Sequence, residues 1–403
     1  MRSRLGSAST VWLVSFGIGL LFLVRGAFQP YIFPLFENLH GFSYFQIAFL
    51  LNIYVFAQSL GAPIAGWYTD RTSSSVALAT SSVLGFVSFL LLATGSGSAM
   101  SGAAVFVAGL AFVLGKIALN TILVLNSSPE ELRSSVAKRA ILLNVGSFLG
   151  NSIAMEMIAR VGCRAHFVLL GLLSLPFGMS LAAATPSLPL HPEAKKKTWG
   201  MEHVSCLFSN RDFVADGLRR FAVVLPYGCW GTIIPKYLID QYHSNDPVWI
   251  VSLTSVCTTI LCAHLFAVNL ADKLARLGFQ WEWWSMTSVS FYCSGLMLLM
   301  FATTPFLLPV AIAIFICGEV LMTPVFDETA KKHSRSESMG TCMGLLHLVD
   351  GMGRLIGAAF ALGLYGWMRG SPQQNYFWPV VVTTFFVTAT ALHVVARTIA
   401  RRD

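Results

Sequence analysis

Apolar segments about 20 residues long follow one another along the whole chain. We distinguish twelve, at residues 10–32, 43–67, 74–95, 101–124, 140–158, 165–185, 214–238, 247–269, 283–303, 305–326, 340–366 and 375–396. An α-helix rises about 1.5 Å per residue, so about 20 residues cross the roughly 30 Å hydrocarbon core of a bilayer. Backbone groups in lipid must pair within the chain, which helices achieve. The sequence therefore predicts an all-α membrane protein with twelve transmembrane helices.

The composition fits this class and excludes others. Hydrophobic residues make up 55% of the chain and charged residues only 11%, whereas soluble proteins carry about 25% charge. The net charge of +8 would suit a nucleic-acid partner, but the basic residues lie in short loops between apolar runs, so we expect the lipid bilayer as partner and no nucleic acid. The eight Cys lie mostly inside apolar runs at irregular spacings. They predict packing, with no metal, cofactor or disulfide framework.

Lysines and arginines are distributed unevenly between the two sides of the predicted bilayer. Of the 27, 18 lie at the N-terminus, in loops after even-numbered segments or at the C-terminus. The other loops hold only Arg160, Arg164 and Arg369. Basic residues favour the cytoplasmic side. We therefore expect a multi-pass protein of the cell (inner) membrane with both termini in the cytoplasm.

Landmarks of the first half recur about 200 residues later. The pairs are Pro34 and Pro235, Asp70 and Asp272, and Gly115-Lys116 and Gly318-Glu319. The repeat unit is half the chain. It predicts two pseudo-symmetric six-helix bundles, residues 1–185 and 214–403, joined by a cytoplasmic linker at 186–213. Parallel halves of this kind are typical of transporters that work by alternating access.

The loop between the second and third segments carries a recognisable motif. It begins at Gly66 and ends in Asp70-Arg71, with three residues between Gly66 and Asp70, and a degenerate copy surrounds Asp272. The motif resembles the loop signature of the major facilitator superfamily, G-x-x-x-D-R. The resemblance covers the whole chain and implies the major facilitator fold. It also implies that these four residues form a cytoplasmic latch that holds one conformation.

Within that superfamily the chain most resembles the bacterial twelve-span drug/proton antiporters. The stretch 339–344, which leads into a glycine-rich eleventh segment, is similar to theirs. Such antiporters also carry G-x-x-x-G-P-x-x-G-G on the fifth span. Here Gly146 and Gly150 match its first glycines, but the proline and the final glycines are missing. The resemblance favours export, and this departure keeps import open.

Ionisable side chains inside the apolar segments are the main functional candidates, because a charge at the bilayer centre costs about 2.5–3.5 kcal/mol on insertion scales. Lys116 is followed after four residues by Asn120, and Glu319 by Thr323. Four residues make about one helical turn, so each pair shares a face. The resemblance implies that spans 1, 4, 7 and 10 line a central cavity. We therefore expect Lys116 and Glu319 to face each other across it.

Two other spans add candidates to this cavity. Arg25 and Gln29 form a similar pair on the first span, and Tyr227 and Trp230 lie three residues apart on the seventh, where packing is the alternative to substrate contact. On the eleventh span, His347, Asp350 and Arg354 form a polar stripe that the resemblance places between the halves. An ion pair between Asp350 and Arg354 and a contact with substrate are both open. The stripe and the cavity together are the predicted site.

These observations predict a proton-coupled secondary active transporter of a small organic molecule, with efflux as the leading direction. The alternative is a proton-coupled importer of a small organic anion, since Arg25 and Lys116 make one half of the cavity cationic. Glu319 is the expected proton carrier; the other interpretation is a permanent ion pair with Lys116. The chain contains no Walker loop and no HExxH motif, so we expect no enzyme activity. We expect a monomer.

Overall fold

The computed structural model describes residues 7–29, 36, 41–95, 97–185, 205, 207–230, 233–234, 237, 281–301, 307–334 and 338–400. Within these ranges all regular structure is helical. Eight of the described helices are long and apolar enough to cross a membrane. The all-α membrane fold is thus confirmed. The count of twelve spans includes residues outside the described ranges, such as 247–269, and stays a prediction.

The chain divides into two compact units. The first contains Met1–Cys206 together with Ala330–Gly351, and the second contains Leu207–Thr329 together with Met352–Asp403. The short stretch Ala330–Gly351 thus packs with the first unit although it lies in the second half of the sequence. It carries the end of one helix and the start of the next.

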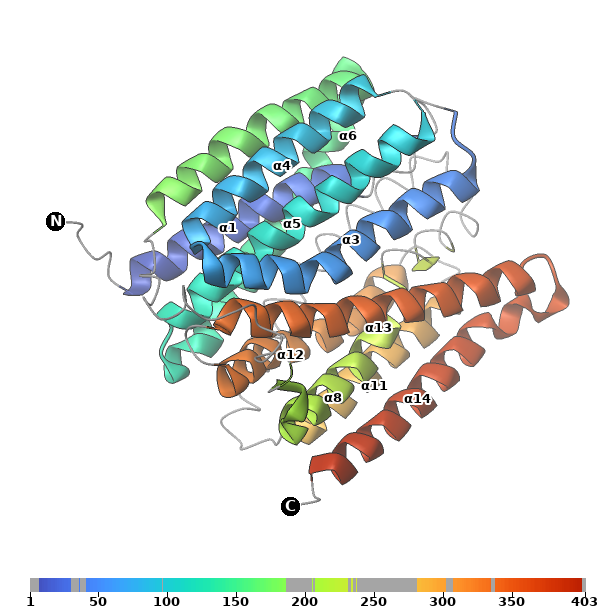
Figure 1. The fold of residues 1–403 in the computed structure, drawn as a ribbon. Helices are drawn as coiled ribbons and strands as arrows, with labels where there is room; N and C mark the ends of the chain where they lie inside the picture. Colours follow the sequence, from blue (N-terminus) through green and yellow to red (C-terminus); the bar gives the residue numbers. More distant parts are fainter. Residues whose placement is uncertain are drawn as a thin grey trace. The chain divides into compact units, whose positions relative to one another are not determined.

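Five helices of the N-terminal half build most of the first unit (Figure 1). They are α1 (Ser7–Phe28), α3 (Tyr44–Arg71), α4 (Ser74–Thr94), α5 (Ser98–Asn126) and α6 (Pro129–Ala184). Helix α6 packs against α1 and α4, and α5 packs against α3 and α4. Helices α3 and α4 both begin at serine N-caps, Ser43 and Ser73, whose hydroxyls accept from backbone N–H groups three residues on.

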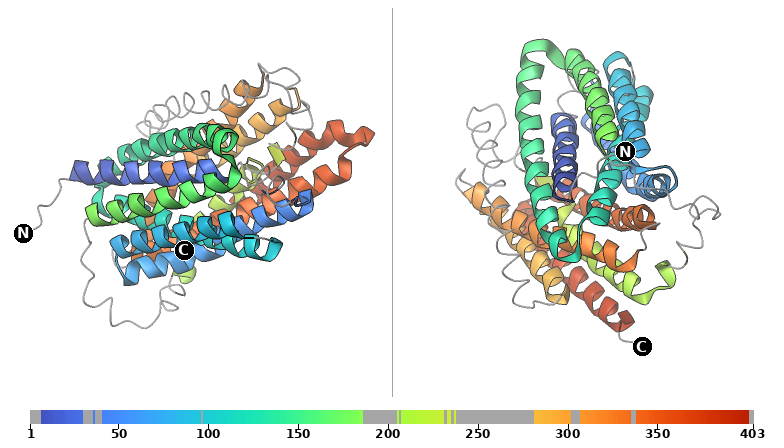
Figure 2. Two further views of the ribbon diagram at one scale, coloured as in Figure 1. Left: turned by 90° about the horizontal axis from the view of Figure 1, so that it is seen from above. Right: turned by 90° about the vertical axis from the view of Figure 1, so that its left-hand side faces the viewer.

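Helix α6 turns back on itself and provides two of the predicted spans. Its backbone is non-helical at Gly162, where φ is 81°, a conformation that glycine adopts without the steric cost that a Cβ brings. Figure 2 shows the two antiparallel arms that meet at this turn. The turn lies between the predicted spans 140–158 and 165–185, as expected from the charged residues there.

Glycines allow the first arm of α6 to approach α1 closely. A Cβ at Gly146 would clash with the carbonyl oxygen of Gly19, and one at Gly150 with that of Leu23. Small residues at helix contacts are the usual means of close packing in membranes. The two glycines noted in the fifth predicted span therefore have a packing role in this fold.

Phe28 is the centre of the aromatic core of the first unit. Its ring meets three others edge to face, at centroid distances of 5.6 Å to Tyr54, 5.4 Å to Phe89 and 6.2 Å to Phe167. These rings come from α3, α4 and α6. Edge-to-face pairs contribute about 0.5–1.5 kcal/mol each beyond the area they bury, so Phe28 ties α1 to three neighbours.

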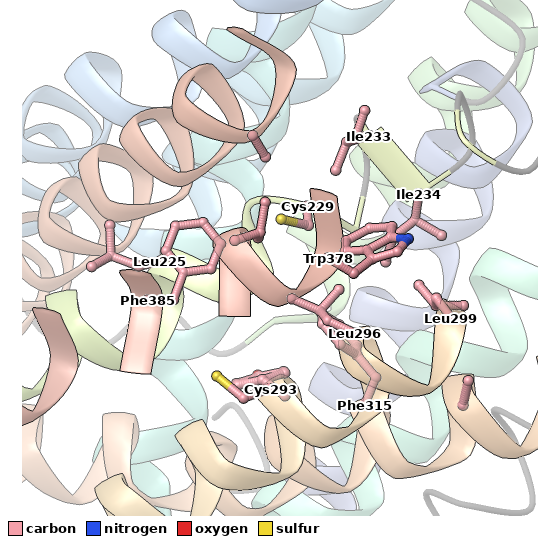
Figure 3. Close-up of a cluster of buried hydrophobic side chains, with 14 of the residues drawn as sticks. Leu225, Cys229, Ile233, Ile234, Cys293, Leu296, Leu299, Phe315, Trp378 and Phe385 are labelled. Atoms are coloured by element: carbon pink, nitrogen blue, oxygen red, sulfur yellow. The ribbon is translucent and has the colours of Figure 1, made fainter. Parts of the chain in front are cut away.

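The second unit is built from α8 (Arg211–Tyr227), α11 (Trp281–Leu299), most of α12 (Leu307–His333), most of α13 (Met339–Met368), the 3₁₀ helix η3 (Pro372–Tyr376) and α14 (Phe377–Ala400). Helix α14 packs against α8 and α11. Figure 3 shows its apolar core, to which α8, α11, α12 and α14 contribute Leu225, Leu296, Phe315 and Trp378. Trp283 and Val387 are at least 60% exposed, which suits helices surrounded by lipid.

Candidate functional site

The second unit brings Glu319 and Tyr227 together. The Tyr227 hydroxyl donates a hydrogen bond of 3.0 Å to the Glu319 carboxylate. On the ring of the same tyrosine lies the Arg354 guanidinium, whose central carbon is 4.3 Å from the ring centroid. Tyr227 is thus in contact with an acid through its hydroxyl and with a cation through its face. We call these three residues the acid–phenol–arginine cluster.

Aromatic rings enclose this cluster. Phe315 stacks on Tyr227 at 6.1 Å and on Trp230 at 5.5 Å. The buried Tyr292 meets Phe315 at 4.7 Å and Tyr227 at 5.9 Å. Glu319 is half-buried beside these rings, and partial removal from water strengthens the electrostatic interactions of a carboxylate. The sequence suggested Tyr227 and Trp230 for packing or substrate contact; Tyr227 contacts Glu319, and Trp230 packs on Phe315.

Arg220, on α8, is a second cation near the acid–phenol–arginine cluster. Its guanidinium lies 4.9 Å from the Phe326 ring centroid, and one nitrogen donates to the Met322 carbonyl at 3.3 Å. Like Glu319 and Arg354, Arg220 is near enough to Tyr292 to interact with its hydroxyl electrostatically. On α12, the hydroxyl of Thr323 donates to the Glu319 backbone carbonyl at 2.9 Å. One member of the polar face predicted for α12, the Thr323 hydroxyl, is therefore hydrogen-bonded within its own helix.

In the first unit, Arg25 occupies a similar aromatic environment with a neutral partner. Its guanidinium lies 5.2 Å from the Phe22 ring centroid and 4.9 Å from that of Phe112. Its Nε donates to the Gln29 amide oxygen at 2.7 Å, so the predicted pair on the first span does interact. Arg25 also lines a cavity of about 90 Å³ whose other walls come from α1, α3, α4, α5 and α6.

Lys116 and Asn120, predicted to share a polar face of α5, differ in their surroundings. Lys116 is half-buried. Asn120 is only 3% exposed, and its side-chain oxygen accepts a 3.0 Å hydrogen bond from Arg139, which is itself buried. The Asn120 side chain therefore joins α5 to α6. Among the described residues this Arg139 contact is a buried polar interaction that the sequence analysis missed.

Asp70 holds the start of α13. Its carboxylate accepts from the Gly340 N–H at 2.8 Å, the Thr341 N–H at 2.7 Å and the Thr341 hydroxyl at 2.7 Å. A carboxylate at a helix N-terminus is favourable because it meets unpaired N–H groups and the positive end of the helix dipole. A Cβ at Gly66 would clash with the Gly340 carbonyl, so glycine is needed there.

A second contact places a cation at the C-terminal end of a helix, where Asp70 places an anion at a helix start. Lys331, near the end of α12, donates to the carbonyl of Ser127 at the C-terminal end of α5, where a cation complements the negative end of the helix dipole. Arg71 lies with its guanidinium 5.2 Å from the Trp67 ring centroid. Asp272, the fourth predicted latch residue, lies outside the described residues. The described part of the latch thus consists of a carboxylate on one helix start and an ammonium on one helix end.

The polar stripe of α13 is divided between the units. His347 is half-buried and Asp350 is 4% exposed, and both belong to the first unit. Arg354 belongs to the second unit, where it stacks on Tyr227. The expected ion pair between Asp350 and Arg354 stays a prediction. No group of three His, Cys, Asp or Glu side chains suited to a metal occurs in the described part of the chain.

Comparisons with known proteins agree with this architecture. The family model of the Major Facilitator Superfamily matches residues 14–358. No curated protein sequence matches the chain. Among the solved structures that match is the human organic anion transporter MFSD10 (TETRAN), with 14% sequence identity, a TM-score of 0.71, and coverage of 96% of this chain and 100% of that one. At this identity the likeness concerns the fold.

Proposed function

Because the chain belongs to the Major Facilitator Superfamily, a family of membrane transporters, we propose that it is a proton-coupled secondary active transporter of a small organic molecule. The family and the fold make it a multi-pass membrane transporter and not an enzyme. Proton coupling, alternating access and efflux are the proposal, as are an inner-membrane location, cytoplasmic termini and a monomeric state.

The observation that carries the proposal is the hydrogen bond between Tyr227 and Glu319 beneath the Arg354 guanidinium. A carboxylate inside a membrane bundle is costly unless it has a role or a partner. Tyr227 donates to this carboxylate and carries the Arg354 guanidinium on its ring, so a conformational change that moves Tyr227 alters both contacts at once. A movement that separates these groups would therefore load a proton, and their return would release it.

The latch supports alternating access. Asp70 makes three hydrogen bonds to the start of α13, and hydrogen bonds to a charged group contribute about 1.5–3 kcal/mol each. Such contacts are strong enough to hold one conformation and weak enough to break during a cycle. Lys116 is a candidate from its sequence position, and we propose that it takes part in the same transport cycle.

The arginines and lysine on helices of the two units support the proposal that the substrate bears a negative charge. Arg25 and Lys116 lie on helices of the first unit, and Arg220 and Arg354 lie on helices of the second. Guanidinium groups bind carboxylates and phosphates through paired hydrogen bonds. The similar solved structure is described as an organic anion transporter, which is consistent with this choice. Import of such an anion is the second candidate, favoured by the missing proline and glycines after Gly150.

Transport by purified protein in liposomes tests the proposal. A panel of organic anions, neutral amphiphiles and cations identifies a substrate by its ability to drive proton flux, read with an entrapped pH dye. Glu319→Gln should lower proton-driven accumulation at least tenfold, while substrate exchange without a gradient persists. The matched control is Glu156→Gln, which neutralises an exposed glutamate paired with Arg160 on α6.

Full gradient-driven accumulation by Glu319→Gln would show that this carboxylate does not carry the coupled proton. Flux in vesicles of known orientation then separates efflux from import. Accumulation inside inside-out vesicles acidified in their lumen supports efflux, and accumulation in right-side-out vesicles driven by external acid supports import.

A further inference from the structure

The cavity beside Arg25 lies within the first unit and involves none of the acid–phenol–arginine cluster. Arg25 is the charged residue on its wall, and the polar residues Tyr54, Ser81, Ser82 and Ser174 accompany it among apolar side chains. Protein interiors are close-packed and leave few voids larger than a water molecule. A cavity of about 90 Å³ has room for about six to nine water molecules at roughly 10–15 Å³ each. It therefore has room for a small ligand.

The serine hydroxyls of this cavity are committed to the helices. Ser81 donates to the Ala111 carbonyl at 2.7 Å, Ser82 to the Leu78 carbonyl at 2.9 Å and Ser174 to the Gly171 carbonyl at 2.9 Å. Their protons are therefore engaged with backbone carbonyls. Arg25 is the wall residue whose donors suit an anion, because a guanidinium has five N–H donors and the bond to Gln29 uses one of them.

The lining of the cavity extends along much of α1. Its wall on α1 runs from Gly17 to Phe28, which at 1.5 Å per residue is about 16 Å. Arg25 lies toward one end of this wall. The Phe89 and Phe112 rings and the Leu181 side chain contribute apolar surface. An extended apolar body with its charge at one end fits this arrangement.

We propose that this cavity is a binding site for a small amphipathic carboxylate, whose head is held by Arg25 and whose short apolar chain lies along α1 toward Gly17. The site is distinct from the acid–phenol–arginine cluster. It rests on the proposed function in one respect, since it gives the anionic substrate a place at Arg25, but it does not depend on the direction of transport or on proton coupling. The carboxylate can come from the aqueous phase as a short acid or from the bilayer as a fatty acid.

Gly85 gives a way to close the cavity without disturbing its walls. A Cβ built at this position meets its nearest atom, the Ser174 hydroxyl, at 3.6 Å, which is ordinary contact. Alanine should therefore fit, whereas leucine should extend into the cavity and fill it. Gly178, which also lines the cavity, is unsuitable, because a Cβ there would clash with Ser82.

The test is equilibrium binding to purified full-length protein in detergent, measured by calorimetry with hexanoate, hexanol and hexylammonium as probes. We expect hexanoate to bind at least tenfold more tightly than the other two. Gly85→Leu should weaken hexanoate at least tenfold and Gly85→Ala less than twofold. Arg25→Gln should remove the preference for hexanoate over hexanol, which a merely structural arginine would not do.

Three results would contradict the proposal. Tighter binding of hexylammonium, saturable binding of none of the probes, or unchanged hexanoate affinity in Gly85→Leu would overturn the proposal. If Gly85→Leu does not fold, the loss of preference in Arg25→Gln still decides. A series from butanoate to dodecanoate separates the sources, since each buried CH₂ contributes about 0.8 kcal/mol, or about fourfold. A plateau near eight carbons supports a short aqueous acid, and a continued rise supports a fatty acid from the bilayer.

Discussion

Two arginines in this transporter lie against aromatic rings, one in each unit, and they differ in their polar partner. Arg25 contacts Phe22 and Phe112 and donates to the neutral amide of Gln29. Arg354 lies on Tyr227, whose hydroxyl donates to the carboxylate of Glu319. Cation–π contacts contribute about 0.5–2 kcal/mol and keep a guanidinium in place within apolar surroundings. Both units thus use the same means to hold a cation inside a helical bundle.

The partner decides what each cation can do. An amide leaves the positive charge of Arg25 uncompensated by that bond, so the arginine suits a ligand that brings a negative charge. A carboxylate near Arg354 supplies that charge within the protein and can also take up a proton. Under the two proposals above, one unit binds an anion and the other exchanges a proton, although their arginines are held alike.

The largest effect should come from removing the cation of the second unit. Arg354→Gln should lower proton-driven accumulation about a hundredfold, because Arg354 and Glu319 are half-buried and loss of a charge partner there costs about 3 kcal/mol, the lower end of the range for buried charges, where 1.4 kcal/mol corresponds to a tenfold change. Initial rates in proteoliposomes measure this. Arg354→Lys keeps the charge without the flat guanidinium and should lie between. Near-normal accumulation by Arg354→Gln would show that Arg354 has no part in proton coupling by the acid–phenol–arginine cluster.

Giving the first unit a carboxylate should make it resemble the second. Gln29→Glu places an acid one helical turn from Arg25, in the position of its present hydrogen-bond partner. Hexanoate affinity should fall about thirtyfold, since the new acid competes for Arg25 and a hydrogen bond to a charged group contributes about 2 kcal/mol, where 1.4 kcal/mol corresponds to tenfold. Calorimetry measures the change, and Gln29→Asn is the neutral control. Unchanged affinity in Gln29→Glu would mean that Arg25 does not hold the carboxylate.

Removing one hydroxyl tests the second unit more finely. Tyr227→Phe keeps the ring under Arg354 and deletes the hydrogen bond to Glu319. Proton-driven accumulation should fall about tenfold, because a hydrogen bond to a charged group contributes about 1.5–3 kcal/mol. Proteoliposome flux is the measurement, and Tyr292→Phe, on the neighbouring ring, is the control with a smaller expected effect. Equal effects of the two changes would show that aromatic packing, and not the Glu319 contact, matters.

The helices were predictable because apolar length alone determines what can cross a bilayer. The segment 74–95 corresponds to α4 (Ser74–Thr94), and the turn between two predicted spans lies at Gly162. The start of α6 was not predicted. Arg139 looked like a loop residue before an apolar run, yet α6 begins at Pro129 and buries it. Proline followed by two acidic residues is a helix-start signal that could have revealed this.

The sequence predicted which residues belong to the site, but not which of them contact one another. Intramembrane charge singled out Glu319 and Arg354, and the resemblance placed Tyr227 on a cavity-lining span. That Tyr227 donates to a residue 92 positions away depends on how α8 packs in the second unit, which spacing does not encode. Lys331 was missed for a related reason. It looked like one of several basic residues after an apolar run, and its bond to Ser127 depends on tertiary packing.

The smallest expected effect concerns the rings beside Arg25. Phe112→Leu keeps an apolar side chain but removes one cation–π contact, so hexanoate affinity should fall about threefold, in line with roughly 0.5–1 kcal/mol for such a contact. A double-mutant cycle with Arg25→Gln isolates the interaction from general packing. If Phe112→Leu has the same effect with and without Arg25, the ring only fills space. The guanidinium of the first unit would then be held by Gln29 alone, and its likeness to Arg354 on Tyr227 would be a coincidence of composition.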